Sequence, residues 1–138
     1  MPERAQESDQ VREPRASYAT TPAWLPAVRA RIEHLLTLEE NWDSYGAAPI
    51  RRDLAEEALA TLLEIAPPGT PAPQVFATPR GGLQFEWHLE RFYLEVEPKG
   101  DGVFGLLFEQ DDETICEAED VTDVADIRQM MALLPSGA

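Results

Sequence analysis

Four side chains that can exchange protons or ligate a metal ion stand at alternating positions of two neighbouring segments. Glu86 and His88 lie in the first segment, and Tyr93 and Glu95 lie in the second. If the segments are β-strands joined by a two-residue turn at Glu90-Arg91, His88 pairs with Tyr93 and Glu86 pairs with Glu95 on one face of a sheet. Two carboxylates beside an imidazole can perform general acid–base catalysis or ligate a divalent cation.

The surroundings of these four residues favour a plainer interpretation. A catalytic pair of carboxylates needs a dry pocket that separates the two pKa values, whereas one face of an antiparallel sheet is commonly open to water. Opposed carboxylates also repel each other unless a cation or the arginine of a partner lies between them. A solvated surface, contact with a protein partner, and a metal or catalytic site therefore all remain open for this group.

The segments belong to a region of alternating apolar and polar residues that follows a proline-rich link at 67–73. Short turn signals divide the region into five pieces, and such short connections require antiparallel neighbours. The sequence thus predicts a five-stranded meander with strands near 74–78, 83–89, 92–97, 103–109 and 114–119. We pair the strands through two-residue turns at Arg80-Gly81, Glu90-Arg91 and Asp111-Asp112 and through a five-residue loop at 98–102. This pairing places one apolar set on a single face: Phe76, Phe85, Trp87, Phe92, Leu94, Val96, Phe104, Leu106, Phe108 and Ile115.

The same pairing leaves four small or apolar residues on the opposite face, beside the polar group. These are Val103, Leu107, Cys116 and Ala118. Apolar patches of this kind can be interfaces, so a homodimer formed through this face is a possible assembly.

Apolar residues recur at helical spacing before and after the strands. The patterns predict helices from Pro26 to Glu39 or Glu40, from Arg51 to Ala66, and after a capping Thr122 to about Leu134. The fold class is therefore α+β, with two N-terminal helices, the five-stranded antiparallel meander, and a C-terminal helix. We expect the helices to cover the apolar face of the sheet.

Two regions follow from this organisation. Residues 1–20 are rich in polar residues and proline and predict a disordered tail. Residues 21–135 then form a single α+β domain, which fits the length of the 138-residue chain.

The link between the first two helices is the most distinctive local feature, because it holds two aromatic residues among turn-forming ones. Its residues of interest are Asn41, Trp42, Asp43 and Tyr45. The aromatic pair can form the rim of a ligand site. Alternatively, Trp42 closes the end of the core, Asn41 ends the helix, and Asp43 binds the backbone amides of the loop.

The chain is strongly acidic, with a formal net charge of -15 and a pI of about 4.3. This charge argues against direct binding to nucleic acid or to anionic membranes. Ten acids and two bases fall within residues 99–138, and no base lies between Glu109 and Asp126. We expect a basic or partly apolar protein partner, bound through the polar sheet face and through Glu117, Glu119 and Asp120.

Cofactor and export signals are not found in the sequence. Cys116 is the only cysteine, which excludes an intrachain disulfide and indicates a reducing cytoplasm. No phosphate-binding loop, dinucleotide fingerprint or zinc-ligand spacing occurs, so we predict no cofactor and no metal site. No apolar run reaches the ~20 residues of a membrane span.

Two short motifs resemble a known family. The loop Asn41-Trp42-Asp43-Ser44-Tyr45-Gly46-Ala47 is similar to an Asn-Trp-Asp-Gly-Tyr-Gly-Ala signature, and Thr78 to Trp87 is similar to a Thr-Pro-x-Gly-Gly-Val-Gln-Leu-Glu-Trp signature. Both occur, in this order, in a family of small bacterial proteins. The resemblance implies a bacterial cytosolic domain and no particular activity. Ser44 replaces the glycine of the signature, which predicts against a positive φ at this position.

These observations together favour a non-enzymatic, acidic protein-binding module of a bacterial cytosol. An antitoxin-like or immunity-like partner of a basic protein fits the charge. The alternative is a small metal-binding protein or enzyme that uses the polar outer face of the sheet.

Overall fold

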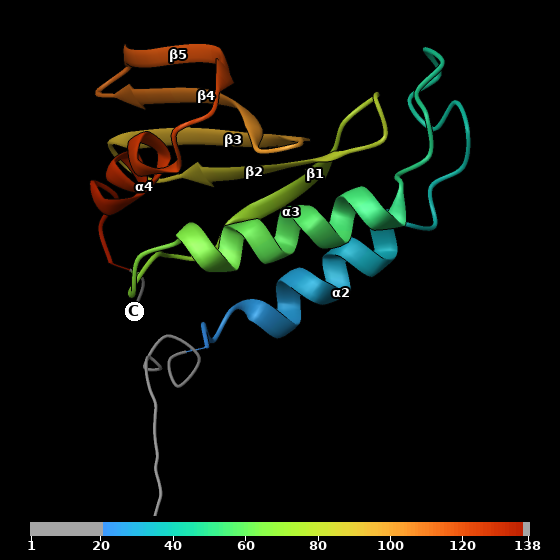
Figure 1. Cartoon of the computed structure of the whole chain (residues 1–138), viewed down its shortest axis with the longest axis horizontal. Helices are drawn as coiled ribbons and strands as arrows, with labels where there is room; N and C mark the ends of the chain where they lie inside the picture. Colours follow the sequence, from blue (N-terminus) through green and yellow to red (C-terminus); the bar gives the residue numbers. More distant parts are fainter. Residues whose placement is uncertain (1–20, 137–138) are drawn as a thin grey trace, which may run out of the picture.

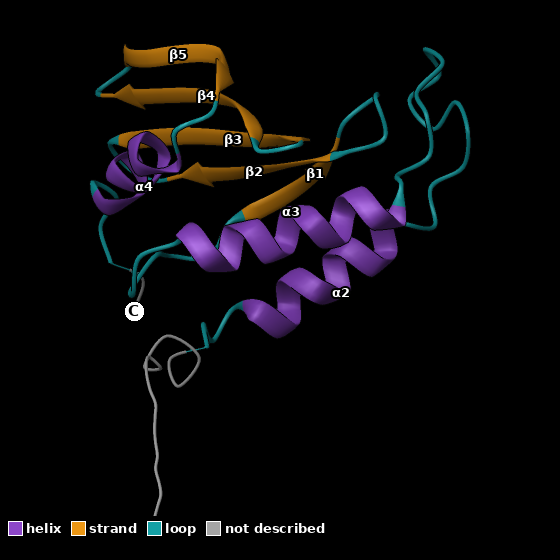
Figure 2. Cartoon of the chain, in the orientation of Figure 1, coloured by secondary structure: helices purple, strands orange, loops and turns teal. Residues whose placement is uncertain are grey.

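The structure is a computed structural model, and it describes residues 21–136. In chain order the elements are α2 (Leu25–Leu35), α3 (Arg52–Ile65), β1 (Gln74–Ala77), β2 (Leu83–His88), β3 (Phe92–Gly100), β4 (Val103–Gln110), β5 (Glu113–Val121) and α4 (Val124–Ala132). The predicted tail at 1–20 lies outside the described residues. The predicted α+β class is confirmed, because the described chain forms three helices and one antiparallel sheet in the order β1-β2-β3-β4-β5 (Figure 2).

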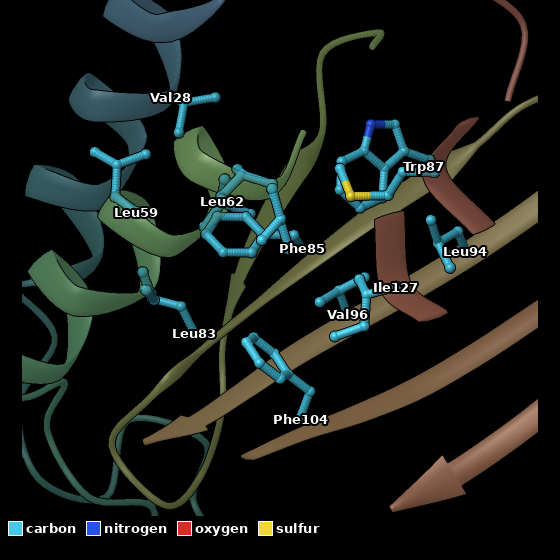
Figure 3. Packing of buried hydrophobic residues seen from close by; sticks show 14 of the residues in the cluster. Val28, Leu59, Leu62, Leu83, Phe85, Trp87, Leu94, Val96, Phe104 and Ile127 are labelled. Atoms are coloured by element: carbon cyan, nitrogen blue, oxygen red, sulfur yellow. The ribbon is translucent and has the colours of Figure 1, made fainter. Parts of the chain in front are cut away.

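One hydrophobic core joins the helices to one face of the sheet. Figure 1 shows α2 and α3 beside the β1 end of the sheet and α4 across its middle, with β5 farthest from α2 and α3. The close view in Figure 3 shows side chains of helices and strands meeting around Phe85, Trp87 and Ile127, each almost completely buried. The sheet side that carries this core is called the inner face below, and the other side is called the outer face.

The pairing of β2 with β3 follows the prediction. Trp87 lies opposite Leu94 and Phe85 opposite Val96, on the inner face. A two-residue turn between the strands sets this register, so the length of the turn was enough to predict which residues pair.

The register of β3 with β4 differs from the prediction by two residues. Val96 pairs with Leu106 and Leu94 with Phe108, because a two-residue turn at Asp101-Gly102 replaces the five-residue loop and a bulge between Pro98 and Gly100 adds one residue to β3. An even shift leaves every side chain on its predicted face. The inner face therefore stays apolar, although its partners change.

The placement of Phe76 on the inner face was wrong. Val75 rather than Phe76 lies opposite Phe85, and Phe76 is 38% exposed. The connection between β1 and β2 holds five residues, 78–82, in place of the expected two-residue turn. An odd shift of the register inverts the whole strand, so Val75 is buried and Phe76 lies on the outer face.

The placements of Ile115, Cys116 and Ala118 were also wrong, because the β4–β5 pairing shifts register twice. Cys116 lies opposite Phe108 and Ala118 opposite Leu106, which puts both on the inner face. Ile115 stands at the first register shift and is 54% exposed. The apolar patch expected on the outer face, and with it the argument for a homodimer, thus loses two of its four members.

The helix limits differ from expectation at two ends. α2 stops at Leu35 rather than Glu39 or Glu40, because the amide and hydroxyl of Thr37 both bond to the His34 carbonyl and tighten the last turn. At α4 the cap is Asp123 rather than Thr122, since Asp123 Oδ1 accepts from Ala125 N at 2.9 Å.

Within residues 21–136, none of the helices combines the length and the apolar composition that crossing a membrane requires.

Candidate functional site on the outer face of the sheet

The structure brings together the four polar residues that the sequence analysis paired. Glu86 lies opposite Glu95, and His88 lies opposite Tyr93, in the predicted register. The rings of His88 and Tyr93 are 4.4 Å apart between centroids. All four side chains occupy the outer face, one residue out of phase with the buried Phe85, Trp87, Leu94 and Val96.

Glu86 is the most enclosed carboxylate of this group. Its side chain is 13% exposed and is held within β2, where Gln84 Nε2 donates to one oxygen at 2.6 Å and His88 Nε2 lies 2.9 Å from the other. His88 itself is 53% exposed. Both oxygens of Glu86 are therefore occupied by neighbours two residues away on the same strand.

Glu95 is satisfied in the same way on β3. The Tyr93 hydroxyl donates to Glu95 Oε2. Partial burial, followed by this hydrogen bond and the charges of the two glutamates, raises the pKa of Tyr93 well above its ordinary value. The phenol therefore remains a proton donor and does not act as a base at neutral pH.

These contacts give each of the two opposed glutamates a hydrogen-bond partner on its own strand. Each carboxylate turns along its own strand toward a donor, so the repulsion expected from their pairing is offset by hydrogen bonds. No group of three or more His, Cys, Asp or Glu side chains within residues 21–136 is arranged to hold a metal ion. The alternative of a metal-binding site on this face thus gains no support from the arrangement of donors.

Basic side chains neutralise part of the remaining acidity. Arg80 contacts Glu97 at 2.7 Å and Lys99 contacts Glu119 at 2.8 Å. The hydrogen bond and charge of Lys99 hold the pKa of Glu119 below its usual value. The sequence analysis missed Arg80, Gln84 and Lys99 as partners of the acidic residues, although the alternation of β3 places Lys99 on the same face as Glu95.

The last strand keeps an excess of negative charge. Glu117 and Asp120 are exposed and form no ion pair with any residue in the described range, whereas Glu119 is paired with Lys99 across the sheet. Glu117 lies opposite Leu107, which puts it on the outer face. The predicted partner-binding residues therefore form two separate groups, because β3 and β4 lie between the acids of β5 and the pair Glu86 and His88 on β2.

The loop between α2 and α3 is held by its own polar side chains. Asp43 Oδ1 accepts from Tyr45 N at 2.8 Å and from Ala47 N at 3.0 Å, as expected for a carboxylate that binds loop amides. Asn41 Oδ1 accepts from Gly46 N at 2.7 Å. Asn41 does not end the helix, since α2 stops six residues earlier, at Leu35.

Two aromatic residues of this loop have different surroundings. Trp42 is half-buried and donates from Nε1 to the Ala48 carbonyl at 2.8 Å. Trp42 does not belong to the core cluster; Ile50, at the other end of the same connection, does. Tyr45 is 91% exposed. Ser44 has a φ of 68°, so the prediction against a positive φ at this position was wrong; the turn within the loop imposes the left-handed conformation regardless of the residue type.

The second motif of the sequence analysis contacts the short segment that joins the first motif to α3. Ala48 N donates to the Pro79 carbonyl and Arg51 N donates to the Gly81 carbonyl, both at 2.9 Å. A Cβ atom on Gly81 would stand 2.9 Å from the Pro49 carbonyl oxygen. The close approach of the two backbones gives the second motif a structural role at the start of α3.

Comparison of the chain with protein-family models, curated proteins and solved structures finds no match.

Proposed function

We propose that the protein is a non-enzymatic, acidic binding module of a bacterial cytoplasm whose partner is a basic protein. The observation that carries the proposal is the uneven neutralisation of the acidic residues on the outer face and along β5. Glu86, Glu95, Glu97 and Glu119 have donors on neighbouring residues, whereas Glu117 and Asp120 on β5 are exposed and without a counter-charge in the described chain.

Charge of this kind suits recognition by a basic surface. Complementary potentials accelerate encounter and suppress wrong partners, and exposed charges lose less hydration on pairing than buried ones. With no base between Glu109 and Asp126, and with Glu119 and Asp111 neutralised by Lys99 and Arg91, this end of the molecule keeps an excess of negative charge. An antitoxin-like or immunity-like role fits a module that covers a basic partner, by analogy at the level of charge.

The proposal is tested by reversing charge at two matched places. In one variant Glu117, Glu119 and Asp120 are changed to lysine; in the control, Glu39, Glu40 and Glu57 are changed to lysine. Both sets are exposed, and the control set lies on the helical side of the molecule. Each variant and the unmodified chain are immobilised and exposed to lysate of the source bacterium, and captured proteins are measured by mass spectrometry.

We expect a basic protein to be captured by the unmodified chain and by the control, and to be lost from the β5 variant. Capture should also weaken as salt rises, since exposed charges are screened over about 10 Å at 0.1 M ionic strength. Equal capture by both variants, or no basic protein with any of the three, would refute the proposal.

A further inference from the structure

The two edges of the sheet are built differently. β1 has four residues and lies beside α2, and Arg31 Nε donates to the Val75 carbonyl at 3.0 Å. One carbonyl of this short edge is therefore already occupied by a side chain of α2. β5 has nine residues and, among the described elements, a neighbour on one side only. Along the other side, peptide N–H and C=O groups of alternate residues face outward.

From this difference we propose that β5 is the docking edge, where an extended basic segment of the partner adds as a sixth strand. The inference rests on the proposed function and specifies how the partner binds. Strand addition takes its affinity from backbone hydrogen bonds and its specificity from side chains at alternate positions.

The side chains of β5 define the chemistry of that segment. Glu113, Glu117, Glu119 and Asp120 are exposed along the strand, and no basic residue interrupts them. Like charges directly opposite one another destabilise strand pairing. A second copy of β5 is thus a poor occupant, and a strand bearing lysine or arginine is a good one.

One apolar contact supplements the charge. Ile115 lies where the register shifts between Thr114 and Cys116, and it is 54% exposed. Its large apolar side chain is available for contact with an added strand. Cross-strand pairs with a β-branched side chain stabilise an added strand. The segment that fits is consequently amphipathic, with basic residues and β-branched residues in alternation.

The experiment uses a synthetic probe, a peptide of about eight residues in which lysine and valine alternate, long enough to span most of β5 at about 3.4 Å per residue. The control peptide has the same sequence with N-methyl groups on four consecutive central residues. It keeps the charge but loses N–H donors along both of its edges. Binding to the full chain is measured by calorimetry, and hydrogen exchange is followed at the amides of residues 113–121.

We expect the unmodified peptide to bind at least about tenfold more tightly than the methylated one and to slow exchange at alternate amides of β5. Ile115→Thr, which keeps the β-branch and removes apolar surface, should weaken binding roughly two- to fivefold, the scale of one cross-strand pair. Equal affinity of the two peptides with unchanged exchange in β5 would overturn strand addition while leaving charge recognition intact. Absence of binding by both peptides at millimolar concentration would also overturn it, whereas the proposed function itself fails only in the charge-reversal experiment.

Discussion

At the scale of single residues, Asp43 shows how one carboxylate determines the shape of a loop. One of its oxygens accepts from the amides of Tyr45 and Ala47. Replacing Asp43 with alanine leaves both amides without this acceptor, so we expect Asp43→Ala to lower the free energy of unfolding by about 1–2 kcal/mol. Urea denaturation followed by tryptophan fluorescence measures the change.

Tyr45 supplies the control for this loop. Its side chain is 91% exposed, so Tyr45→Ala should change stability by less than about 0.5 kcal/mol. If both substitutions cost the same, the hydrogen bonds of Asp43 are not what holds the loop.

Tyr93 makes stability depend on alkaline pH. Its pKa is raised in the folded chain, so its contribution is complete below the unfolded pKa of about 10 and is lost as pH rises above that value. We expect the stability of the unmodified chain, relative to Tyr93→Phe, to fall between pH 9 and about 11. Urea denaturation at several pH values tests this; a difference that stays constant would show that Tyr93 ionises normally in the folded state.

Residue types alone predicted the polar group on β2 and β3 but not its internal bonding. Alternation put Glu86 and Glu95 on one face and opposite each other, as the structure confirms. The donors that satisfy them depend on rotamers and on nearby side chains such as Gln84. Similarly, the left-handed conformation of Ser44 depends on the loop closing around Asn41 and Asp43, and residue preference at that position argued for the opposite.

At the scale of elements, the 78–82 connection docks closely onto the start of α3. Gly81 has a φ of 89°, and an added Cβ atom would lie 2.9 Å from the Pro49 carbonyl oxygen. Gly81→Ala combines the cost of a left-handed alanine with a backbone clash, so we expect a loss of at least about 2 kcal/mol in thermal or urea denaturation.

Gly102 is the matched control, since its φ is 74° and nothing lies within 4 Å of its added Cβ atom. Gly102→Ala should cost only about 1 kcal/mol, the price of the left-handed conformation. Equal losses of unfolding free energy in the two variants would mean that the contact between the 78–82 connection and the start of α3 does not contribute to stability.

Element types were predictable because each carries a periodicity that belongs to a helix or a strand. The exact pairing was predictable where a two-residue turn joins the strands, as between β2 and β3. It was not predictable where a loop of odd length or a bulge changes parity, which is why Phe76 and Ile115 were assigned to the wrong face. Bulges leave little trace in hydrophobic alternation, because two residues then share one partner.

At the scale of the whole molecule, the excess of acid sets how copies of the chain behave toward one another. The net charge of -15 at neutral pH keeps molecules apart, and the charge approaches zero near the pI of about 4.3. We expect dynamic light scattering to show single particles at pH 7.5 and growing assemblies near pH 4.3, with recovery on return to neutral pH. Scattering that is unchanged across this range would indicate that charge does not govern association.

The short β1 edge also limits what assemblies the sheet can build. An open filament of sheets grows only when each subunit has two free edges, so that one edge pairs with the preceding subunit and the other with the next. With Arg31 of α2 bonded to the Val75 carbonyl and β1 only four residues long, pairing that starts at β5 has no second edge of equal length and freedom on this chain. Copies of this chain therefore do not join edge to edge into an open fibre through their sheets, because a contact at β5 uses the one long free edge that each copy offers among its described strands.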